Sequence, residues 1–197
     1  MSQDQKISRT VAQRGIQELL RRKYQNNLLL FAKEVLGYKD LEDYPHGEVA
    51  ARLITGKKRK LFLLPRGSFK STLITVAFPL WYACYNPNVR ILIRSETYAN
   101  AVKFLGTIKE HIEKNHELRA IYGILGAKNK SELWTNTEMT INTRTKTMPE
   151  PTFDCAGIDV AKVGRHYEFI IHDDLQSQMN TQTSEQIQKV VEDYKSS

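Results

Sequence analysis

The sequence predicts an α/β fold with a mainly parallel central sheet and an N-terminal helical extension. Short apolar segments typical of buried strands occur at residues 61–64, 89–94 and 167–172. Segments with helical spacing of apolar residues, 71–85 and 98–115, separate them. This alternation favours a parallel sheet with right-handed crossovers. Two of the apolar segments end in polar residues suited to binding an anion or a metal, which places a candidate site at one edge of the sheet.

The chain is expected to divide into a helical extension at residues 1–56, a core at 57–183 and a helical tail at 184–197. The tail would begin a lid or a linker. Residues 1–9 are expected to be disordered. The helices of the extension are expected at residues 10–24, at 28–36 and in a third segment that ends near Ile54. The apolar side of the first helix would consist of Val11, Ile16, Leu19 and Leu20.

Two further expectations concern the core. Pro79 lies inside the helical segment 71–85 and should kink or end it. Residues 139–143 alternate like a half-buried strand, and residues 152–156 form a further strand candidate.

The composition is that of a globular protein with a basic surface. Of the 197 residues, 41% are hydrophobic and 26% are charged, which argues against a disordered chain. The net charge of +7 favours an anionic partner such as a nucleic acid or a nucleotide. Cys84 and Cys155 form no metal-binding pair and fit a reducing compartment. The sequence has neither a membrane-spanning run nor an apolar signal core, so no membrane partner is expected.

A polar loop after the first apolar segment has the layout of a phosphate-binding loop. Backbone N–H groups of such a loop, with the positive end of the following helix, form an anion site. Lys70 would reach the outer phosphates, and the Ser71 hydroxyl would help to hold Mg²⁺. The usual spacing G-x-x-x-x-G-K-[ST] is not kept, because Leu64 and Phe69 stand at the two glycine positions and Gly67 lies between them. An ordinary loop with a solvated lysine is the alternative.

Two acids end the last apolar segment. In nucleotidases with a phosphate-binding loop, an Asp at the carboxyl end of a neighbouring strand holds Mg²⁺ together with the loop hydroxyl. Asp173 has this context, and Asp174 is placed to orient and deprotonate an attacking water. The alternative is a strand-end turn or helix cap.

Taken together, these features resemble the N-terminal ATPase domain of large terminase subunits, the DNA-packaging motor proteins of tailed bacteriophages. The phosphate loop of that family often carries an early arginine, here Arg66, and lacks the standard glycines. Pro45 and His46 lie in a segment that resembles the one packed near the nucleotide base in the family. The segments that carry the likeness are residues 45–48, 65–72, 95–101, 150–153 and 164–175. The resemblance implies a three-layer P-loop NTPase fold of the RecA-like (ASCE) type.

The resemblance also implies an ATP hydrolase that requires Mg²⁺. The phosphates would lie over residues 66–72, and Mg²⁺ would lie between Ser71 and Asp173, with Asp174 orienting the water. The nucleotide-binding residues would be Pro45, His46, Arg66, Gly67, Ser68, Phe69, Lys70, Ser71 and Thr72.

A positive group is needed at the transition state of phosphoryl transfer. Arg66 would supply it within the subunit, whereas Arg165 or Arg144 would reach the site of a neighbour in a ring. A surface salt bridge or a contact with a DNA phosphate is the alternative for each arginine.

The family's partners are double-stranded DNA, the portal protein and the small terminase subunit. A homo-oligomeric ring is expected when the motor is assembled at the procapsid portal in the host cytoplasm, and a monomer is expected in isolation. The nuclease domain that follows the ATPase domain in this family is absent, so the chain is expected to be a fragment. Candidate DNA-backbone contacts are Lys57, Lys58, Arg59, Lys128, Lys130, Arg144 and Lys146.

Other classes of protein remain open on the sequence alone. A helicase-like DNA-dependent ATPase would share the core, and a small-molecule kinase would share the phosphate loop. A non-enzymatic binding domain with a decayed loop would bind no nucleotide.

Overall fold

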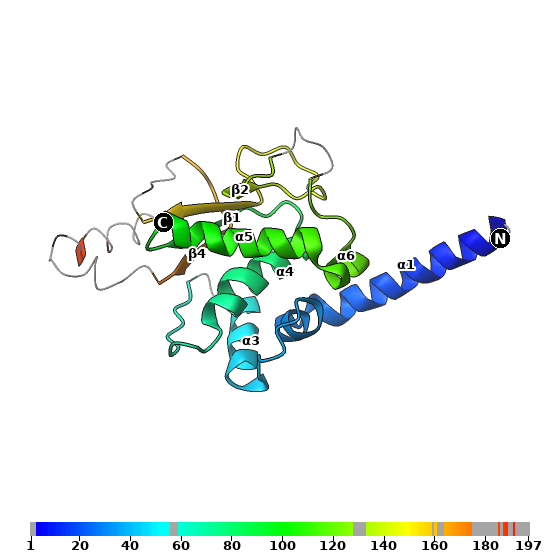
Figure 1. Cartoon of the computed structure of the whole chain (residues 1–197), viewed down its shortest axis with the longest axis horizontal. Coiled ribbons are helices and arrows are strands. Elements are labelled where there is room, and N and C mark those ends of the chain that lie inside the picture. Colours follow the sequence, from blue (N-terminus) through cyan, green and yellow to red (C-terminus); the bar gives the residue numbers. More distant parts are fainter. Residues whose placement is uncertain are drawn as a thin grey trace.

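The computed structural model describes residues 3–55, 59–127, 133–158, 160, 164–174, 185, 187, 188 and 191, with side chains from Val11 onward. Most of the expected tail at 184–197 lies outside these residues. Helix α1 (Gln3–Gln25) projects from the body of the molecule (Figure 1). It begins seven residues before the predicted helix, so the expectation of disorder is wrong for residues 3–9.

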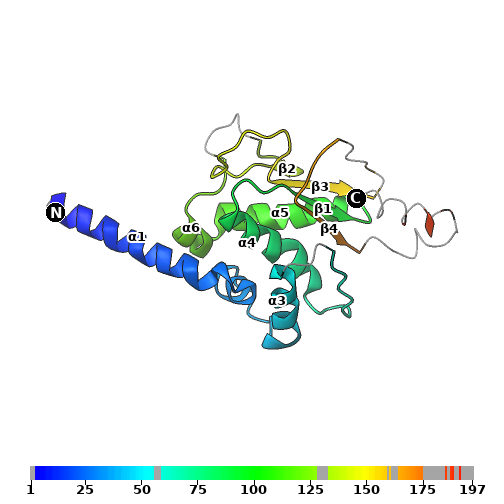
Figure 2. The ribbon, with the colours of Figure 1, turned by 180° about the vertical axis from the view of Figure 1, so that it is seen from behind.

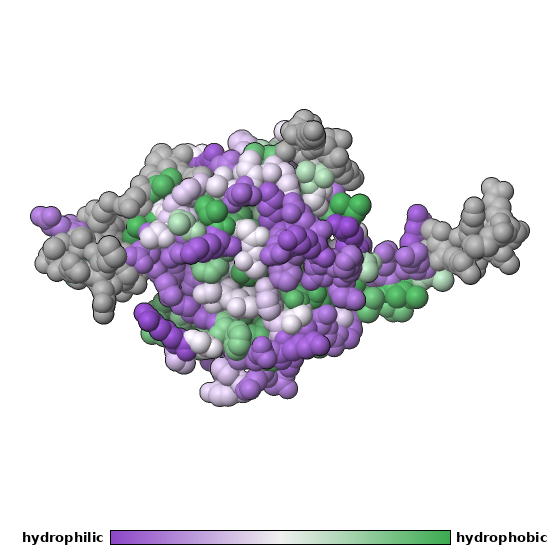
Figure 3. Space-filling view, viewed as in Figure 1, coloured by the Kyte–Doolittle hydropathy of each residue, from purple (hydrophilic) through white to green (hydrophobic). Residues whose placement is uncertain are grey.

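Most of the predicted apolar side of α1 lies away from the core. Val11, Ile16 and Leu19 are exposed on the projecting part of the helix, where Figure 3 shows apolar surface. Only the end of the helix packs against the body, through Leu20 and the buried Tyr24. The helix is held there by hydrogen bonds rather than by a continuous apolar stripe. Trp81 Nε1 donates to the Tyr24 carbonyl at 2.9 Å, and Arg21 Nε donates to the Ile121 carbonyl at 2.8 Å.

The other two helices of the extension form where the sequence predicts them. The first consists of α2 (Leu28–Leu30) and η1 (Phe31–Val35), and the Asn27 side chain caps it by accepting from Leu30 N–H. Gly37, with φ of +82°, follows its end. The short turn η2 (Asp43–Gly47) leads directly into α3 (Glu48–Ile54). Leu28, Phe31 and Leu53 of these helices belong to the same hydrophobic core as the sheet.

The sheet has four strands in the order β2-β3-β1-β4 (Figure 2). Strand β1 (Ile91–Ser95) pairs in parallel with both β3 (Phe153–Gly157) and β4 (Phe169–Asp173). Strand β2 (Glu138–Met139) is antiparallel to β3 and shorter than predicted. The protein is therefore α/β with a mixed, mostly parallel sheet, and the predicted central strands at 89–94, 152–156 and 167–172 are confirmed.

The helical segment around Pro79 changes its hydrogen-bond pattern. Residues of η3 (Thr72–Ala77) have π-helical spacing, and α4 (Phe78–Tyr85) follows without a break. Phe78 N–H donates to the Leu73 carbonyl, five residues back. Pro79 therefore lies inside a continuous helix, directly after the change from π-helical to α-helical hydrogen bonding, and it does not end the helix. Helix α5 (Tyr98–Lys114) matches its prediction closely, whereas α6 (His116–Tyr122) was not predicted.

The predicted strand at residues 61–64 is wrong for the structure as described. These residues belong to no strand, and among the described residues β4 pairs with β1 alone. Their side chains nevertheless alternate, because Phe62 and Leu64 pack against the core while Leu61 and Leu63 are 80% and 84% exposed. The burial of alternate side chains is achieved here without a ladder of backbone hydrogen bonds.

The described helices cover one face of the sheet. Ile91, Ile93, Cys155 and Ile171 point to the hydrophobic core on this face, and α5 contacts β1 and β3 while η3 contacts β4. The alternate residues of the strands, among them Arg94 and Asp154, point to the other face. A helical layer over that second face, which the predicted three-layer fold requires, is not seen among the described residues. Within the same residues, no helix has the length and apolar character needed to cross a membrane.

Candidate functional site

The loop before η3, residues 65–69, contains an internal hydrogen bond. Ser68 Oγ donates to the Pro65 carbonyl at 2.7 Å. Helical backbone begins at Lys70, and the first helical bond runs from Leu73 N–H to the Phe69 carbonyl at 2.9 Å. The N–H groups of the first turn have no partner within the helix. They lie at its positive end, which is the arrangement expected of an anion site.

Phe69 adopts a backbone conformation that glycine usually supplies. Its φ is +52°, and that of Gly67 is +77°. Left-handed backbone costs a residue with a side chain about 1–2 kcal/mol. Surrounding contacts must offset this cost. Phe69 therefore takes the left-handed backbone conformation that a glycine would supply, although the glycine pattern is not kept at position 69.

Lys70 joins the loop to the two acids at the end of β4. Its Nζ lies 3.4 Å from Asp173 Oδ1 and also bonds Asp174 Oδ1. The Asp173 side chain is 4% exposed and that of Asp174 is 74% exposed. Burial alone would lower the pKa of Lys70, but the hydrogen bond that Lys70 donates to Asp174 and the charges of both carboxylates outweigh it and raise the pKa. Lys70 is thus brought into contact with two other predicted site residues that lie more than a hundred positions later in the sequence.

Asp173 is positioned by a residue that sequence reasoning missed. Thr75 Oγ1 donates to Asp173 Oδ2 at 3.1 Å, and both side chains are buried. Ser71 lies about one turn before Thr75 in the same helix. A lone hydroxyl in an otherwise apolar helical stretch, four residues after Ser71, was the available signal.

Mg²⁺ is the cation for which the sequence predicts a site here. Mg²⁺ usually binds one or two protein oxygens and completes its shell with water and substrate phosphates. Ser71 and Asp173 are the pair that would hold it. The described residues contain no group of three or more His, Cys, Asp or Glu side chains able to hold a metal by themselves.

His46 contacts the loop rather than an open cleft. The residue is 6% exposed. Its Nδ1 accepts from Glu42 N–H at 2.8 Å, so Nε2 carries the ring hydrogen and donates to the Ser68 carbonyl at 3.1 Å. The ring also meets that of Phe69 edge-on, with centroids 5.9 Å apart. Pro45, the other residue predicted near the nucleotide base, is half-buried in η2.

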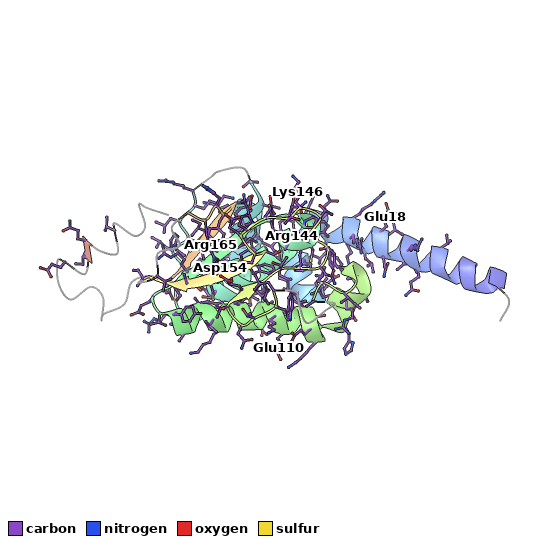
Figure 4. All side chains as sticks on the ribbon, turned by 90° about the horizontal axis from the view of Figure 1, so that it is seen from above. Glu18, Glu110, Arg144, Lys146, Asp154 and Arg165 are labelled. Carbon is purple, nitrogen blue, oxygen red and sulfur yellow. The ribbon has the colours of Figure 1, made fainter. Side chains whose placement is uncertain are left out.

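The three candidate arginines are far from equivalent. Arg66 is exposed in the loop and makes no hydrogen bond or ion pair with the other described residues. Arg165 Nη1 lies 2.7 Å from Asp154 Oδ2 and 2.7 Å from Glu138 Oε1, on the sheet (Figure 4). Strand register places Asp154 three positions before the edge that carries Asp173. Arg165 therefore lies outside the site formed by Lys70.

Arg144 also has a local role. It donates from Nη1 to the Glu150 carbonyl at 2.6 Å and from Nη2 to the Val89 carbonyl at 3.1 Å. Val89 precedes β1, so these bonds lie at the end of the sheet opposite the acids. Burial lowers the pKa of Arg144, with a further lowering by the charge of Arg90.

Only some of the basic residues predicted to contact DNA are described. Arg59 and Lys146 are exposed, and Arg144 is half-buried. Lys57, Lys58, Lys128 and Lys130 lie outside the described residues. Thr72, predicted in the loop, is half-buried in the first turn of η3.

Comparison with known proteins gives no family assignment. No protein-family model matches the chain, and no curated protein sequence matches it significantly.

Proposed function

We propose that the chain is an Mg²⁺-dependent P-loop ATPase of the large-terminase type, whose ATP hydrolysis drives movement of double-stranded DNA. The observation that carries the proposal is the contact of Lys70, in the first helical turn after the loop, with Asp173 and Asp174 at the carboxyl end of β4. A lysine and a strand-end acid meeting over a helix N-terminus is the arrangement that phosphoryl-transfer enzymes use. The terminase assignment rests on the resemblance of the surrounding segments.

Nucleotide binding would begin at the loop. The first-turn N–H groups would receive the phosphates, and Lys70 would exchange Asp174 for their oxygens. Ser71 and Asp173 would hold Mg²⁺, which neutralises charge that develops on the phosphates when it is bound. Thr75 keeps Asp173 oriented during this exchange, because its hydroxyl bonds the oxygen that Lys70 does not approach.

Asp174 becomes available as a proton acceptor once Lys70 leaves it. Its exposed carboxylate would orient a water molecule toward the γ-phosphate and take its proton. Arg66 is exposed in the same loop and supplies positive charge within the subunit.

DNA would bind through its backbone, as a protein that moves any sequence requires. The net charge of +7 and the exposed Arg59 and Lys146 support an electrostatic mode. Affinity should then fall steeply with salt.

The test is phosphate release from ATP by the full chain, with and without double-stranded DNA. Lys70→Ala should lower the rate about 100-fold, the loss seen when one transition-state donor is removed. Asp173→Asn should also lower the rate, because Mg²⁺ would lose a carboxylate ligand. Lys103→Ala is the matched control, because Lys103 is an exposed lysine on α5. Equal rates for wild type and both site variants would refute the assignment.

The measurements with DNA distinguish a packaging motor from the other functions that the sequence leaves open. Stimulation by duplex DNA supports a packaging-type motor, and stimulation by single strands alone indicates a helicase-like enzyme. A rate that ignores DNA but rises with a small phosphate acceptor indicates a kinase. Wild type that binds no ATP indicates a non-enzymatic domain.

A further inference from the structure

The N-terminal extension reaches the phosphate loop through one buried side chain. His46 belongs to η2, which packs against α2 and α3. Helix α3 in turn contacts η3, the helix that follows the loop. His46 is therefore held by the extension on one side and touches the loop on the other.

The two ring nitrogens of His46 have different tasks. Nδ1 accepts from Glu42 N–H at 2.8 Å, which fixes the ring within its own turn. Nε2 donates to the Ser68 carbonyl at 3.1 Å, across 22 positions of sequence. The first bond is local, and the second joins the extension to the loop.

The Ser68 carbonyl determines the direction of an N–H group in the loop. A trans peptide is planar, so its carbonyl and its N–H point in opposite directions. The peptide between Ser68 and Phe69 has its carbonyl toward His46, and Phe69 N–H consequently points away from His46. Successive N–H groups around left-handed residues form anion-binding concavities, and Phe69 has φ of +52°. The edge-on contact of the His46 and Phe69 rings is a second point at which His46 touches this part of the loop.

We infer that His46 is a positioning residue, which orients the Ser68–Phe69 peptide so that the loop presents its N–H groups to the phosphates of a bound nucleotide. The inference rests on the proposed function for the identity of the anion. It assigns His46 to a contact with the loop backbone, whereas the resemblance suggested a position near the nucleotide base. The extension then shapes the site, although it contributes no residue to the phosphates.

Two substitutions separate the local bond from the bond to the loop. His46→Asn places an oxygen near the position of Nδ1 but cannot reach Ser68. His46→Gln is long enough to keep an N–H donor near the position of Nε2. We expect His46→Asn to raise the Kd of ATP with Mg²⁺ about tenfold, equal to about 1.4 kcal/mol, and His46→Gln to stay within about threefold of wild type. The turnover number should change less than Kd, because uniform binding is lost.

Hydrogen exchange of the loop amides in the nucleotide-free chain gives a readout that needs no activity. Exchange at residues 67–71 should be faster in His46→Asn than in His46→Gln, with equal urea midpoints for the two variants. Wild-type affinity and wild-type loop exchange in His46→Asn would overturn the inference. If wild type binds no ATP and Lys70→Ala changes nothing, the proposed function fails, and the exchange comparison still decides whether His46 orients the loop.

Discussion

Arg165→Ala tests whether this arginine stabilises the sheet or serves a reaction. Arg165 Nη1 lies 2.7 Å from Asp154 Oδ2, and the Asp154 side chain is 0% exposed. The Tyr167 hydroxyl donates to the same oxygen. Loss of the guanidinium would leave a buried carboxylate without this cation, so we expect the variant to be clearly less stable.

The size of the loss follows from burial. Removing one partner of a buried ion pair costs about 3–5 kcal/mol. The lower end applies, because the Arg165 side chain is 36% exposed and the Tyr167 bond remains. For a chain of this length, about 3 kcal/mol lowers Tm by roughly 6–12 °C.

Thermal and urea unfolding followed by circular dichroism measure this change. Arg66→Ala is the matched control, since Arg66 is exposed in a loop and its loss should change stability by less than about 0.5 kcal/mol. A Tm for Arg165→Ala equal to that of Arg66→Ala would refute the reasoning. If Arg165→Ala kept wild-type stability but lost ATP hydrolysis, Arg165 would act on a nucleotide. This is the result expected of an arginine that reaches a neighbour's site.

Three further outcomes are expected. Thr75→Val should lower the free energy of unfolding by about 1.5–3 kcal/mol, because Asp173 loses a buried donor. In an Asp173→Asn background the same substitution should cost less. If the losses of the two single variants simply added in the double variant, the reasoning would be contradicted. The backbone N–H of His166 first, and Arg90 beside it, hold the pKa of Glu150 at about 2, below its ordinary 4.5. Its contribution is therefore full above pH 4.5 and lost as pH falls to 2, so urea midpoints of wild type and Glu150→Gln should converge over that window; a constant gap would contradict this. Trp81→Phe should cost about 1–3 kcal/mol, as the Tyr24 carbonyl loses a buried donor, and its urea midpoint checks this.

The parts of the fold that could be predicted are those that local pattern determines. Helix α5 has apolar residues at regular helical spacing, and Thr97 caps its start by accepting from Asn100 N–H. Strands β1 and β3 are short and buried along their whole length. For such segments, neighbours in sequence already decide the structure.

The failures are segments whose state depends on distant partners. Residues 61–64 are apolar and alternate in burial, yet whether they pair with β4 depends on how the two segments are placed in the tertiary structure. The apolar residues of α1 have helical spacing, but nothing in their pattern shows that the helix projects beyond the body. In the candidate site, Lys70 and the strand-end acids were identified because their residue types are tied to phosphate chemistry. Arg165 was ambiguous, because its partner Asp154 is recognisable only once the strands are aligned.

The ion pairs of Lys70 have an electrostatic consequence for the order of ligand entry. One lysine faces two carboxylates, so the cluster as it stands carries one negative charge. A triphosphate arriving alone would meet charge of its own sign at short range, screened least at the buried Asp173. A triphosphate that already carries a divalent cation brings the compensating charge with it. Under the proposed function, the resting cluster would therefore favour the nucleotide that arrives with its cation over the free nucleotide.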